Sequence, residues 1–356
     1  MVKLTVKINE QEKSYPIIIN DKPVSTLKED IFSRLEGKKF LVVISEKVEK
    51  IYGKALGFEK DEKFILKDGE KEKNFKNYKK LLERALKLQM TRKDTIIAIG
   101  GGVVGDLAGF AASTYMRGIN FIQVPTTLLA CVDSSVGGKT GIDTDFGKNL
   151  VGAFYQPSVV FINTNFLTSL DDRQFKTGMG EVVKYAFIEK SCRADEELNL
   201  TNFLSENTEK ILSRNLTTLE KLIEICVKLK ISVVQKDEKE SGLRKILNFG
   251  HTYGHAVEKI TNYKKFTHGE AIVKGMEFAF KLAVKRNIID KNYKFFADDV
   301  IKKFGFKSIP DYPLEKMIKL MRMDKKAEFE YITFILPTDY SEVAEFKLTE
   351  KDILKL

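Results

Sequence analysis

Residues 95–125 read TIIAIGGGVVGDLAGFAASTYMRGINFIQVP, and the predicted architecture rests on them. The apolar strand TIIAIG leads into a turn of glycines, the helical stretch GDLAGFAASTY follows, and a second strand, NFIQV, ends at Pro125. A strand, a helix and another strand in this order usually form a crossover between parallel neighbours in one sheet. These residues therefore predict an α/β fold with a parallel sheet.

Alternation of strands and helices extends from this unit through the first half of the chain. Short runs rich in β-branched residues and bounded by polar residues are typical of sheet strands. Apolar residues at helical spacing, among them Leu81 and Leu82, indicate helices between the strands. We expect strands at VKLTVKI (2–8), SYPIIIN (14–20), FLVVIS (40–45), FILK (64–67) and SVVFIN (158–163), and helices over residues 46–56 and 78–90.

Long helical periodicity replaces this alternation from about Leu170 onward. The length of 356 residues suggests two domains or one large one, and the change of pattern favours two. We therefore predict an α/β domain over residues 1–168 and a helical domain over residues 169–356, with ligands in the crevice between them. Helices are expected over residues 172–189, 217–235, 245–260, 268–285 and 314–323, and YITFIL (331–336) is the only strand expected near the C-terminus.

The composition is that of an ordinary globular protein. Hydrophobic residues make up 43% of the chain and charged residues 31%, which excludes a mainly disordered protein. Three cysteines, Cys131, Cys192 and Cys226, are too few and too far apart for a disulfide-stapled secreted module. The start MVKLTVKINE lacks the apolar run of a signal peptide, and five glycines with Asp106 argue against a membrane span over residues 95–116. We expect a soluble cytoplasmic protein with no membrane partner.

The chain has an excess of basic residues, since 60 Lys+Arg against 50 Asp+Glu leave a formal charge of +10. This excess raises the question of nucleic-acid binding. The lysines, however, are interleaved with acidic residues, as in KDGEKEKNFKNYKK (67–80). Such mixing is typical of a solvated surface rather than of a stripe that follows phosphates. We expect no nucleic acid partner, although that alternative stays open. A small anionic substrate would exploit the same positive charge.

The glycine turn allows two interpretations. Gly100, Gly102 and Gly105 fit the pattern G-x-G-x-x-G, and bare backbone at a helix start suits a pyrophosphate. No acidic residue closes the next strand, however, so the usual ribose-binding carboxylate is missing and a tight packing turn explains the glycines equally well. A second segment, SSVGGKTG (134–141), resembles the end of a Walker A loop, but Asp133 replaces its first glycine and makes an ATPase a weak hypothesis.

Three histidines, His251, His255 and His268, lie within 18 residues. His251 and His255 are four residues apart on an expected helix, so both imidazoles can project from one face and chelate a metal. Two unrelated histidines that share a face are the alternative. The third histidine favours the metal, and a carboxylate of unknown position would complete an open catalytic site. Thr252 stands where a zinc protease has its glutamate, which leaves protease chemistry unsupported.

Seven motifs in order identify a family resemblance. They are GGGVVGDLAGFAASTYMRG, VPTTLLACVDSSVGGKTGID, GKNLVGAFYQP, GMGEVVKYA, GLRKILNFGHTYGHA, HGEAI and DKK. With this series the chain resembles the 3-dehydroquinate synthase family of sugar phosphate cyclases, over nearly its whole length. The resemblance implies a Rossmann-like domain joined to a helical domain, a homodimer, a catalytic NAD and a zinc or cobalt ion. It also implies a lyase of the shikimate pathway, which makes 3-dehydroquinate and phosphate from 3-deoxy-D-arabino-heptulosonate 7-phosphate on the way to chorismate and aromatic amino acids.

The resemblance also assigns residues. The metal ligands would be Glu181, His251 and His268, so that His255 becomes a substrate contact instead of a ligand. The other substrate contacts would be Arg117, Asp133, Lys139, Lys148, Asn149, Lys184, Lys230, Arg244, Asn248 and Lys325. The NAD site would comprise Gly101, Gly102, Asp106, Thr126, Thr127, Glu70 and Lys73, together with Asp133, Lys139 and Lys148. Ser45-Glu46 replaces an aspartate that many members have, so Glu46 or another residue would hold the ribose.

The implied reaction explains why these residue types are needed. Transient oxidation by NAD acidifies a neighbouring C–H, phosphate leaves by β-elimination and takes the proton, and re-reduction, ring opening and an intramolecular aldol step follow. Cations and amides must therefore surround the phosphate, and Arg244 would hold the substrate carboxylate with its planar fork. The alternatives are another sugar phosphate cyclase such as a 2-deoxy-scyllo-inosose synthase, whose substrate lacks a carboxylate, and a metal-dependent polyol dehydrogenase, which would release NADH.

Overall fold

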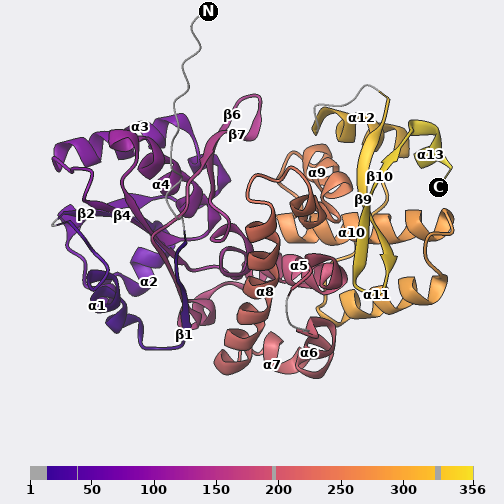
Figure 1. Cartoon of the computed structure of the whole chain (residues 1–356), viewed down its shortest axis with the longest axis horizontal. Coiled ribbons are helices and arrows are strands. Elements are labelled where there is room, and N and C mark those ends of the chain that lie inside the picture. Colours follow the sequence, from indigo (N-terminus) through magenta and orange to yellow (C-terminus); the bar gives the residue numbers. More distant parts are fainter. Residues whose placement is uncertain (1–13, 38, 195–197, 325–329, 356) are drawn as a thin grey trace, which may run out of the picture.

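The computed structural model of the chain describes residues 14–37, 39–194, 198–324 and 330–355. Figure 1 shows two parts side by side, an α/β part from the first half of the chain and a mainly helical part that carries a small sheet. The strands are β1 (Ile17–Asn20), β2 (Phe40–Ser45), β3 (Lys63–Leu66), β4 (Thr95–Gly100), β5 (Asn120–Pro125), β6 (Lys139–Thr144), β7 (Gly147–Phe154), β8 (Val159–Asn163), β9 (Ile332–Asp339) and β10 (Glu342–Leu348).

The helices separate and cover these strands. The α-helices are α1 (Leu27–Phe32), α2 (Glu46–Leu56), α3 (Phe75–Lys87), α4 (Gly102–Thr114), α5 (Asp172–Ile188), α6 (Leu200–Glu206), α7 (Thr208–Leu212), α8 (Leu216–Lys236), α9 (His251–Ile260), α10 (His268–Lys285), α11 (Lys291–Lys303), α12 (Leu314–Asp324) and α13 (Glu350–Leu354). Two short helical turns matter for the site, η4 (Tyr115–Arg117) and η8 (Leu243–Asn248). No helix of the described residues is long and apolar enough to cross a membrane.

Six strands form one parallel sheet in the order β1-β8-β5-β4-β2-β3. Residues of β2 alternate between two apolar layers, since Leu41 and Val43 pack with α3 and α4 whereas Val42 and Ile44 pack with α1 and α2. Helices on both faces are the usual environment of a parallel sheet. The predicted α/β fold with a helical second half is therefore confirmed.

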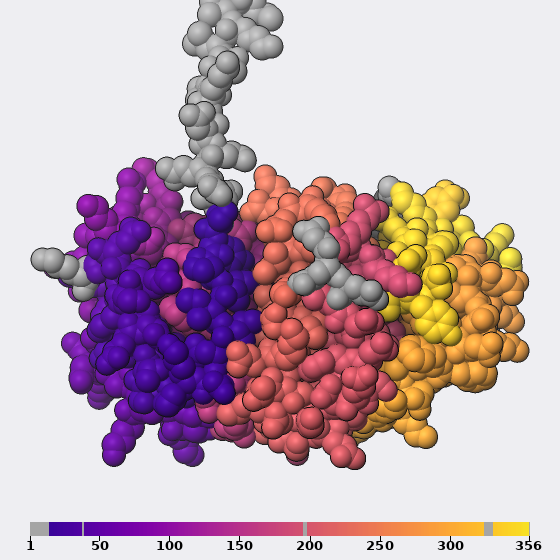
Figure 2. Space-filling view, turned by 60° about the horizontal axis from the view of Figure 1, so that its bottom comes forward, coloured from indigo at the N-terminus to yellow at the C-terminus, as the bar shows by residue number. Residues whose placement is uncertain are grey.

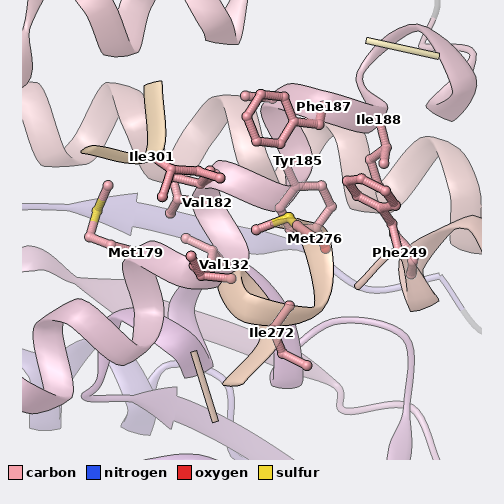
Figure 3. Packing of buried hydrophobic residues seen from close by; sticks show 14 of the residues in the cluster. Val132, Met179, Val182, Tyr185, Phe187, Ile188, Phe249, Ile272, Met276 and Ile301 are labelled. Atoms are coloured by element: carbon pink, nitrogen blue, oxygen red, sulfur yellow. The ribbon is translucent and has the colours of Figure 1, made fainter. Parts of the chain in front are cut away.

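The helical part is organised around α5, whose residues from Thr177 to Ile188 are buried almost without interruption. Figure 3 shows Val182 and Tyr185 of α5 among the apolar side chains of this core, together with Ile272 and Met276 of α10. The same core includes residues of the α/β part, such as those of β8, so the two parts are packed together, as the space-filling view in Figure 2 also shows.

Helices α5, α9 and α10 approach one another at positions that have no side chain. A Cβ atom at Gly180 would lie 2.6 Å from the Cα atom of Gly269, and a Cβ atom at Gly275 would overlap the carbonyl oxygen of Gly250. Gly250 also has a φ of 77°, a left-handed conformation that costs glycine little and turns the chain into α9. These contacts place the start of α10 against the middle of α5, and the start of α9 against the middle of α10.

Some predicted elements need correction. The helix expected over residues 245–260 is interrupted, because Gly250 separates η8 from α9. The expectation of a single C-terminal strand is wrong, because β10 pairs with β9 in an antiparallel hairpin. A second antiparallel hairpin, β6–β7, was not expected at all. The strand predicted at residues 2–8 lies outside the described residues.

Candidate active site

The glycine turn lies at the carboxyl end of β4 and lines a shallow pocket. A Cβ atom at Gly101 would lie 3.0 Å from Cγ2 of Thr127, and one at Gly102 would lie 3.1 Å from Oγ of Ser134. Side chains at these positions would therefore fill the space in front of the turn. No side chain caps the start of α4, where Gly101 is the N-cap. Free backbone N–H groups at a helix start are suited to a phosphate group.

Lys73 lies beside this turn, at the centre of four polar side chains. Its Nζ atom lies 2.9 Å from Oε1 of Glu70, 3.1 Å from Oδ2 of Asp106 and 2.7 Å from Oδ1 of Asn149. Asp143, which was not predicted from the sequence, lies 3.8 Å away. Burial opposes charge on Lys73, but the surrounding carboxylates raise its pKa above the usual value, and burial raises the pKa of Asp106 to about 6. Glu70, Lys73 and Asp106, which were all predicted to contact NAD, thus form one cluster. The cluster also includes Asn149, which was predicted to contact the substrate.

Glu181 carries a buried carboxylate oxygen that faces two imidazoles. Its Oε1 atom lies 3.6 Å from Nε2 of His251 and 3.5 Å from Nε2 of His268. This oxygen accepts no hydrogen bond from the described residues, whereas Oε2 is paired with Nζ of Lys184. Two atoms that bind one tetrahedral zinc ion at about 2.1 Å lie about 3.4 Å apart. The separations therefore fit three ligands of a single divalent ion.

Glycine contacts explain how these three residues meet. Glu181 follows Gly180 in α5, and His268 precedes Gly269 at the start of α10, so the contact between the two glycines places the two side chains together. His251 follows Gly250 in the same way at the start of α9. The Nδ1 atom of His251 lies 3.1 Å from the carbonyl oxygen of Phe249, which turns Nε2 toward Glu181.

The protonation states of this cluster are set by burial and by opposing charges. Burial lowers the pKa of His251 to about 3. Burial also opposes charge on His268, but the carboxylates of Glu181 and Glu258 raise its pKa to about 10. Burial would raise the pKa of Glu181, yet Lys184 and the histidines lower it to about 2. A metal ion here would find an ionised carboxylate and one neutral imidazole, and would displace the proton of His268.

Buried Lys230 and half-buried Asp133 form a second pair next to these residues. Nζ of Lys230 donates to Oδ1 of Asp133 at 2.6 Å, and the hydroxyl of Tyr185 donates to the same oxygen at 3.0 Å. Burial lowers the pKa of Lys230 to about 8, whereas Lys230 and Lys184 outweigh burial and lower the pKa of Asp133. Tyr185 was not predicted, because an aromatic residue in a buried helix gives no sign of a polar contact.

Glu240 contacts two of the predicted substrate residues. Its Oε2 atom is paired with Nζ of Lys139, and its Oε1 atom accepts a hydrogen bond of 2.6 Å from Nδ2 of Asn248. The backbone of Glu240 has a φ of 61°, which is uncommon for a residue with a side chain. Glu240 was not predicted, and its place shortly before the GLR motif was the only signal that could have revealed it.

Arg244 is buried, with 1% of its surface exposed, and its side chain faces the backbone. One terminal nitrogen donates to the carbonyl oxygen of Glu238, and the other donates to that of Gly137 at 3.2 Å. Its Nε atom has no hydrogen-bond partner among the described residues. The guanidinium therefore ties the loop before η8 to the segment just before β6, and its Nε–H group stays unpaired among the described residues.

Lys148 extends from β7 toward the end of α9. Its Nζ atom lies 3.6 Å from Oε1 of Glu258 and 4.3 Å from the ring centroid of Tyr263. The hairpin β6–β7 thus supplies Lys139, Lys148 and Asn149, which reach three different clusters of the site.

His255 lies close to both other histidines, with ring centroids 5.3 Å from His251 and 6.1 Å from His268. The Nε2 atom of His251 lies 3.6 Å from Oε1 of Glu181. His255 also belongs to a second set of possible ligand atoms, which includes Glu258 and His268 and spans 4.8 Å at most. Neither of the two sets found among the described residues contains His251 and His255 together, as the spacing of four residues had suggested.

The structure places the remaining predicted residues as follows. Thr126 adjoins the glycine turn, where its backbone N–H donates to the carbonyl oxygen of Gly100 at 3.0 Å. Arg117 is exposed on η4 and makes none of the contacts described above. Glu46 is exposed at the start of α2, and the preceding Ser45 caps that helix. Lys325 lies outside the described residues.

Comparison with known proteins shows two family models along the chain. The model described as 3-dehydroquinate synthase N-terminal matches residues 63–177, and the model described as 3-dehydroquinate synthase C-terminal matches residues 178–327. A 3-dehydroquinate synthase of Alkaliphilus metalliredigens (strain QYMF) is 43% identical over 351 residues, which cover 97% of this chain and 96% of that protein.

Solved structures agree with the fold. A crystal structure of 2-deoxy-scyllo-inosose synthase complexed with carbaglucose-6-phosphate, NAD+ and Co2+ has a TM-score of 0.81 and 28% identity, and the match covers 95% of each chain. A 2-epi-5-epi-valiolone synthase from Streptomyces hygroscopicus subsp. jinggangensis 5008, with NAD+ and Zn2+ bound, has a TM-score of 0.85 and 21% identity over 99% of this chain and 97% of that chain.

Proposed function

Because the chain belongs to the 3-dehydroquinate synthase family, we propose that the site around Glu181 converts 3-deoxy-D-arabino-heptulosonate 7-phosphate to 3-dehydroquinate and phosphate. This is a lyase reaction of the shikimate pathway. The observation that carries the proposal is the buried Oε1 atom of Glu181, which faces Nε2 of both His251 and His268 without a hydrogen bond from the described residues.

Glu181, His251 and His268 are the proposed ligands of a zinc or cobalt ion. Two imidazoles and one carboxylate form the kind of open three-ligand set that catalytic zinc sites use. When bound, such an ion lowers the pKa of a coordinated hydroxyl and polarises a nascent carbonyl. Lys184 holds the other oxygen of Glu181 and so fixes the orientation of this carboxylate. The related inosose synthase was solved with Co2+, which supports a divalent ion as a cofactor.

NAD is the proposed cofactor of the glycine turn. Gly101 and Gly102 keep the start of α4 open, and Lys73 and Asp106 lie beside it with Glu70. When bound, NAD supplies a reversible hydride acceptor, so that oxidation and re-reduction leave no net redox change. The residues of the turn bind and orient the cofactor, and Thr126 and Thr127 line the same end of the sheet.

The phosphate of the substrate needs cations and amide donors, because charge-assisted hydrogen bonds stabilise it as it leaves. Lys184 is buried beside the proposed metal ligands, and Lys139 and Asn248 already share one carboxylate, that of Glu240. The pair of Asp133 and Lys230 is placed to hydrogen-bond a substrate hydroxyl. The other groups proposed around the substrate are Asn149, Lys148, His255, Arg117 and Lys325.

Arg244 is the proposed ligand of the substrate carboxylate. Its buried Nε–H group has no acceptor among the described residues, and the neighbouring terminal nitrogen retains a hydrogen for a second contact. The substrate analogue in the related inosose synthase, carbaglucose-6-phosphate, has no carboxylate. Arg244 therefore favours the heptulosonate over a hexose phosphate, which has no carboxylate, and separates the proposed reaction from that of the alternative cyclase.

We also propose the finer organisation that the family resemblance implies. It comprises a division near residues 168 and 169 into a NAD-binding domain and a metal- and substrate-binding domain, a homodimer, and a cytoplasmic location.

The decisive experiment measures phosphate release from the heptulosonate phosphate, with and without added NAD and with and without a chelator. We expect release only when NAD and a divalent ion are both present, with no accumulation of the reduced nicotinamide absorbance. Stoichiometric NADH would indicate a polyol dehydrogenase instead. Turnover of glucose 6-phosphate in place of the heptulosonate would indicate the other cyclase.

A further inference from the structure

Glu258 is a buried carboxylate that contacts both the proposed metal site and the proposed substrate site. It lies on α9, and 6% of its side chain is exposed. Its Oε2 atom lies 3.5 Å from Nδ1 of His268, and its Oε1 atom lies 3.6 Å from Nζ of Lys148. Each carboxylate oxygen thus has its own partner, on α10 in one case and on β7 in the other.

The contact with His268 determines which ring nitrogen is available for a metal. A neutral imidazole carries one proton, and a carboxylate at Nδ1 keeps that proton on Nδ1 because only the N–H form donates. The lone pair then lies on Nε2, the atom that faces Oε1 of Glu181 at 3.5 Å. His251 has a weaker version of the same arrangement, since its Nδ1 atom faces the carbonyl oxygen of Phe249. A carboxylate makes the imidazole more basic than a carbonyl does.

The contact with Lys148 ties the same carboxylate to the hairpin β6–β7. The Lys148 ammonium lies between Oε1 of Glu258 and the ring of Tyr263, so the tip of the hairpin is held against the end of α9. One carboxylate therefore sets both the orientation of a proposed metal ligand and the position of a proposed substrate lysine.

Glu258 could instead be a metal ligand itself, because its oxygen lies near nitrogen atoms of His255 and His268. The partners of the two carboxylates argue against this arrangement. The Oε1 atom of Glu181 has no hydrogen bond from the described residues, whereas both oxygens of Glu258 already have partners.

We propose that Glu258 is a positioning residue that holds His268 with Nε2 toward the metal through one carboxylate oxygen and holds Lys148 through the other. The inference rests on the proposed function, since it assumes a metal ion at Glu181, His251 and His268. Removal of an outer carboxylate of this kind typically weakens metal binding by about 10- to 100-fold.

The test compares Zn2+ affinity, measured by competition with a chelator, in the wild-type chain and in Glu258→Gln and Glu258→Leu. We expect about 10-fold weaker binding in Glu258→Gln, which loses only the charge, and a larger loss in Glu258→Leu, which also loses the acceptor. The d–d absorption of the Co2+ form should change in both variants, since the orientation of a ligand changes. Glu277→Gln on α10, whose carboxylate is 40% exposed, is the matched control and should leave both readouts unchanged.

Lys148→Met separates the two contacts, because it should raise the KM for the substrate while leaving Zn2+ affinity within about twofold. Thermal unfolding of the metal-free variants checks that each one is folded. Unchanged Zn2+ affinity and an unchanged Co2+ spectrum in both Glu258 variants would overturn the inference. Two ions bound to the wild-type chain, with one lost in Glu258→Gln, would overturn it in favour of Glu258 as a ligand. A wild-type chain that binds no ion would instead refute the proposed function.

Discussion

The ammonium group of Lys139 is paired with the carboxylate of Glu240, which also accepts a hydrogen bond from Asn248. Both partners of Glu240 belong to the proposed binding site for an anionic substrate, so a protein carboxylate stands where part of a ligand anion would bind. The Lys139 side chain is 51% exposed, and such a pair contributes at most about 1 kcal/mol. A substrate can therefore displace the carboxylate at a small energetic cost.

Replacement of Glu240 by Gln should strengthen anion binding, because the internal carboxylate no longer competes for Lys139. We expect the Kd for inorganic phosphate, measured by calorimetry, to fall by about two- to fivefold. Glu345→Gln, which breaks an exposed pair with Lys245, serves as the control and should have no effect. Weaker phosphate binding in Glu240→Gln would mean that Glu240 positions Lys139 rather than competing with the ligand.

His251→Ala and His255→Ala should differ in metal content although the two residues lie one helical turn apart. His251 faces Oε1 of Glu181 through Nε2, so its loss removes one of three proposed ligands and should abolish stoichiometric Zn2+ binding. His255→Ala should retain the ion and lose turnover. Elemental analysis after dialysis measures the first effect, and phosphate release measures the second. Equal loss of metal in both variants would restore the pair of His251 and His255 as ligands.

Arg244→Ala should lower kcat/KM for the heptulosonate phosphate by on the order of 10²-fold or more. Cutting away one partner of a buried charged pair costs roughly 2–5 kcal/mol. Arg244→Lys should recover only part of this loss, because an ammonium cannot form a two-pronged contact. Zn2+ and NAD affinities should stay close to those of the wild type. Since Arg244 also donates to the carbonyl oxygen of Gly137, thermal unfolding must accompany the kinetics. Wild-type turnover in Arg244→Ala would disprove the carboxylate assignment.

Asp106 should make the stability of the chain depend on pH. Its pKa is raised to about 6 by burial, against about 3.9 in an unfolded chain. Between these values the folded state binds more protons, so the free energy of unfolding falls as the pH rises. Asp106→Asn lacks this dependence and should gain on the order of 1 kcal/mol relative to the wild type between pH 5 and pH 7, as measured by urea unfolding. Asp145→Asn, in the exposed turn of the hairpin, is the control. Parallel pH profiles for the wild type and Asp106→Asn would contradict this prediction.

The sequence predicted the central sheet well because burial on both faces produces nearly continuous apolar strands, such as FLVVIS and TIIAIG. The hairpin β6–β7 was missed for the opposite reason. Its strands carry Lys139, Asp143 and Asn149, whose polar side chains contact Glu240 and Lys73, so they have no apolar pattern to recognise. The continuous helix expected over residues 245–260 failed at Gly250, whose positive φ ends η8 and starts α9.

The pattern of the sequence indicated only some of the residues that meet in the candidate site. The spacing of His251 and His255 suggested a shared helical face, and the two rings do lie 5.3 Å apart. Glu181 lies 70 positions earlier in the chain than His251, however, and only the packing of α10 against both α5 and α9 brings the two residues together. Glu240 and Tyr185 join the candidate site through hydrogen bonds to residues distant in the sequence or outside their own helix. Such contacts produce no periodic pattern in the sequence, so they could not be predicted from it.

The glycine contacts between helices have a consequence for natural variation and for engineering. A methyl group at Gly180 would meet Cα of Gly269, and one at Gly275 would meet the backbone at Gly250, so either substitution would force the helices apart. Every ligating side chain would still be present, yet the chain could no longer assemble them around one ion. A survey of variants that scores only acidic and histidine positions would count such a chain as intact. The proposed metal site therefore tolerates substitution least at four glycines that are not ligands, Gly180, Gly250, Gly269 and Gly275.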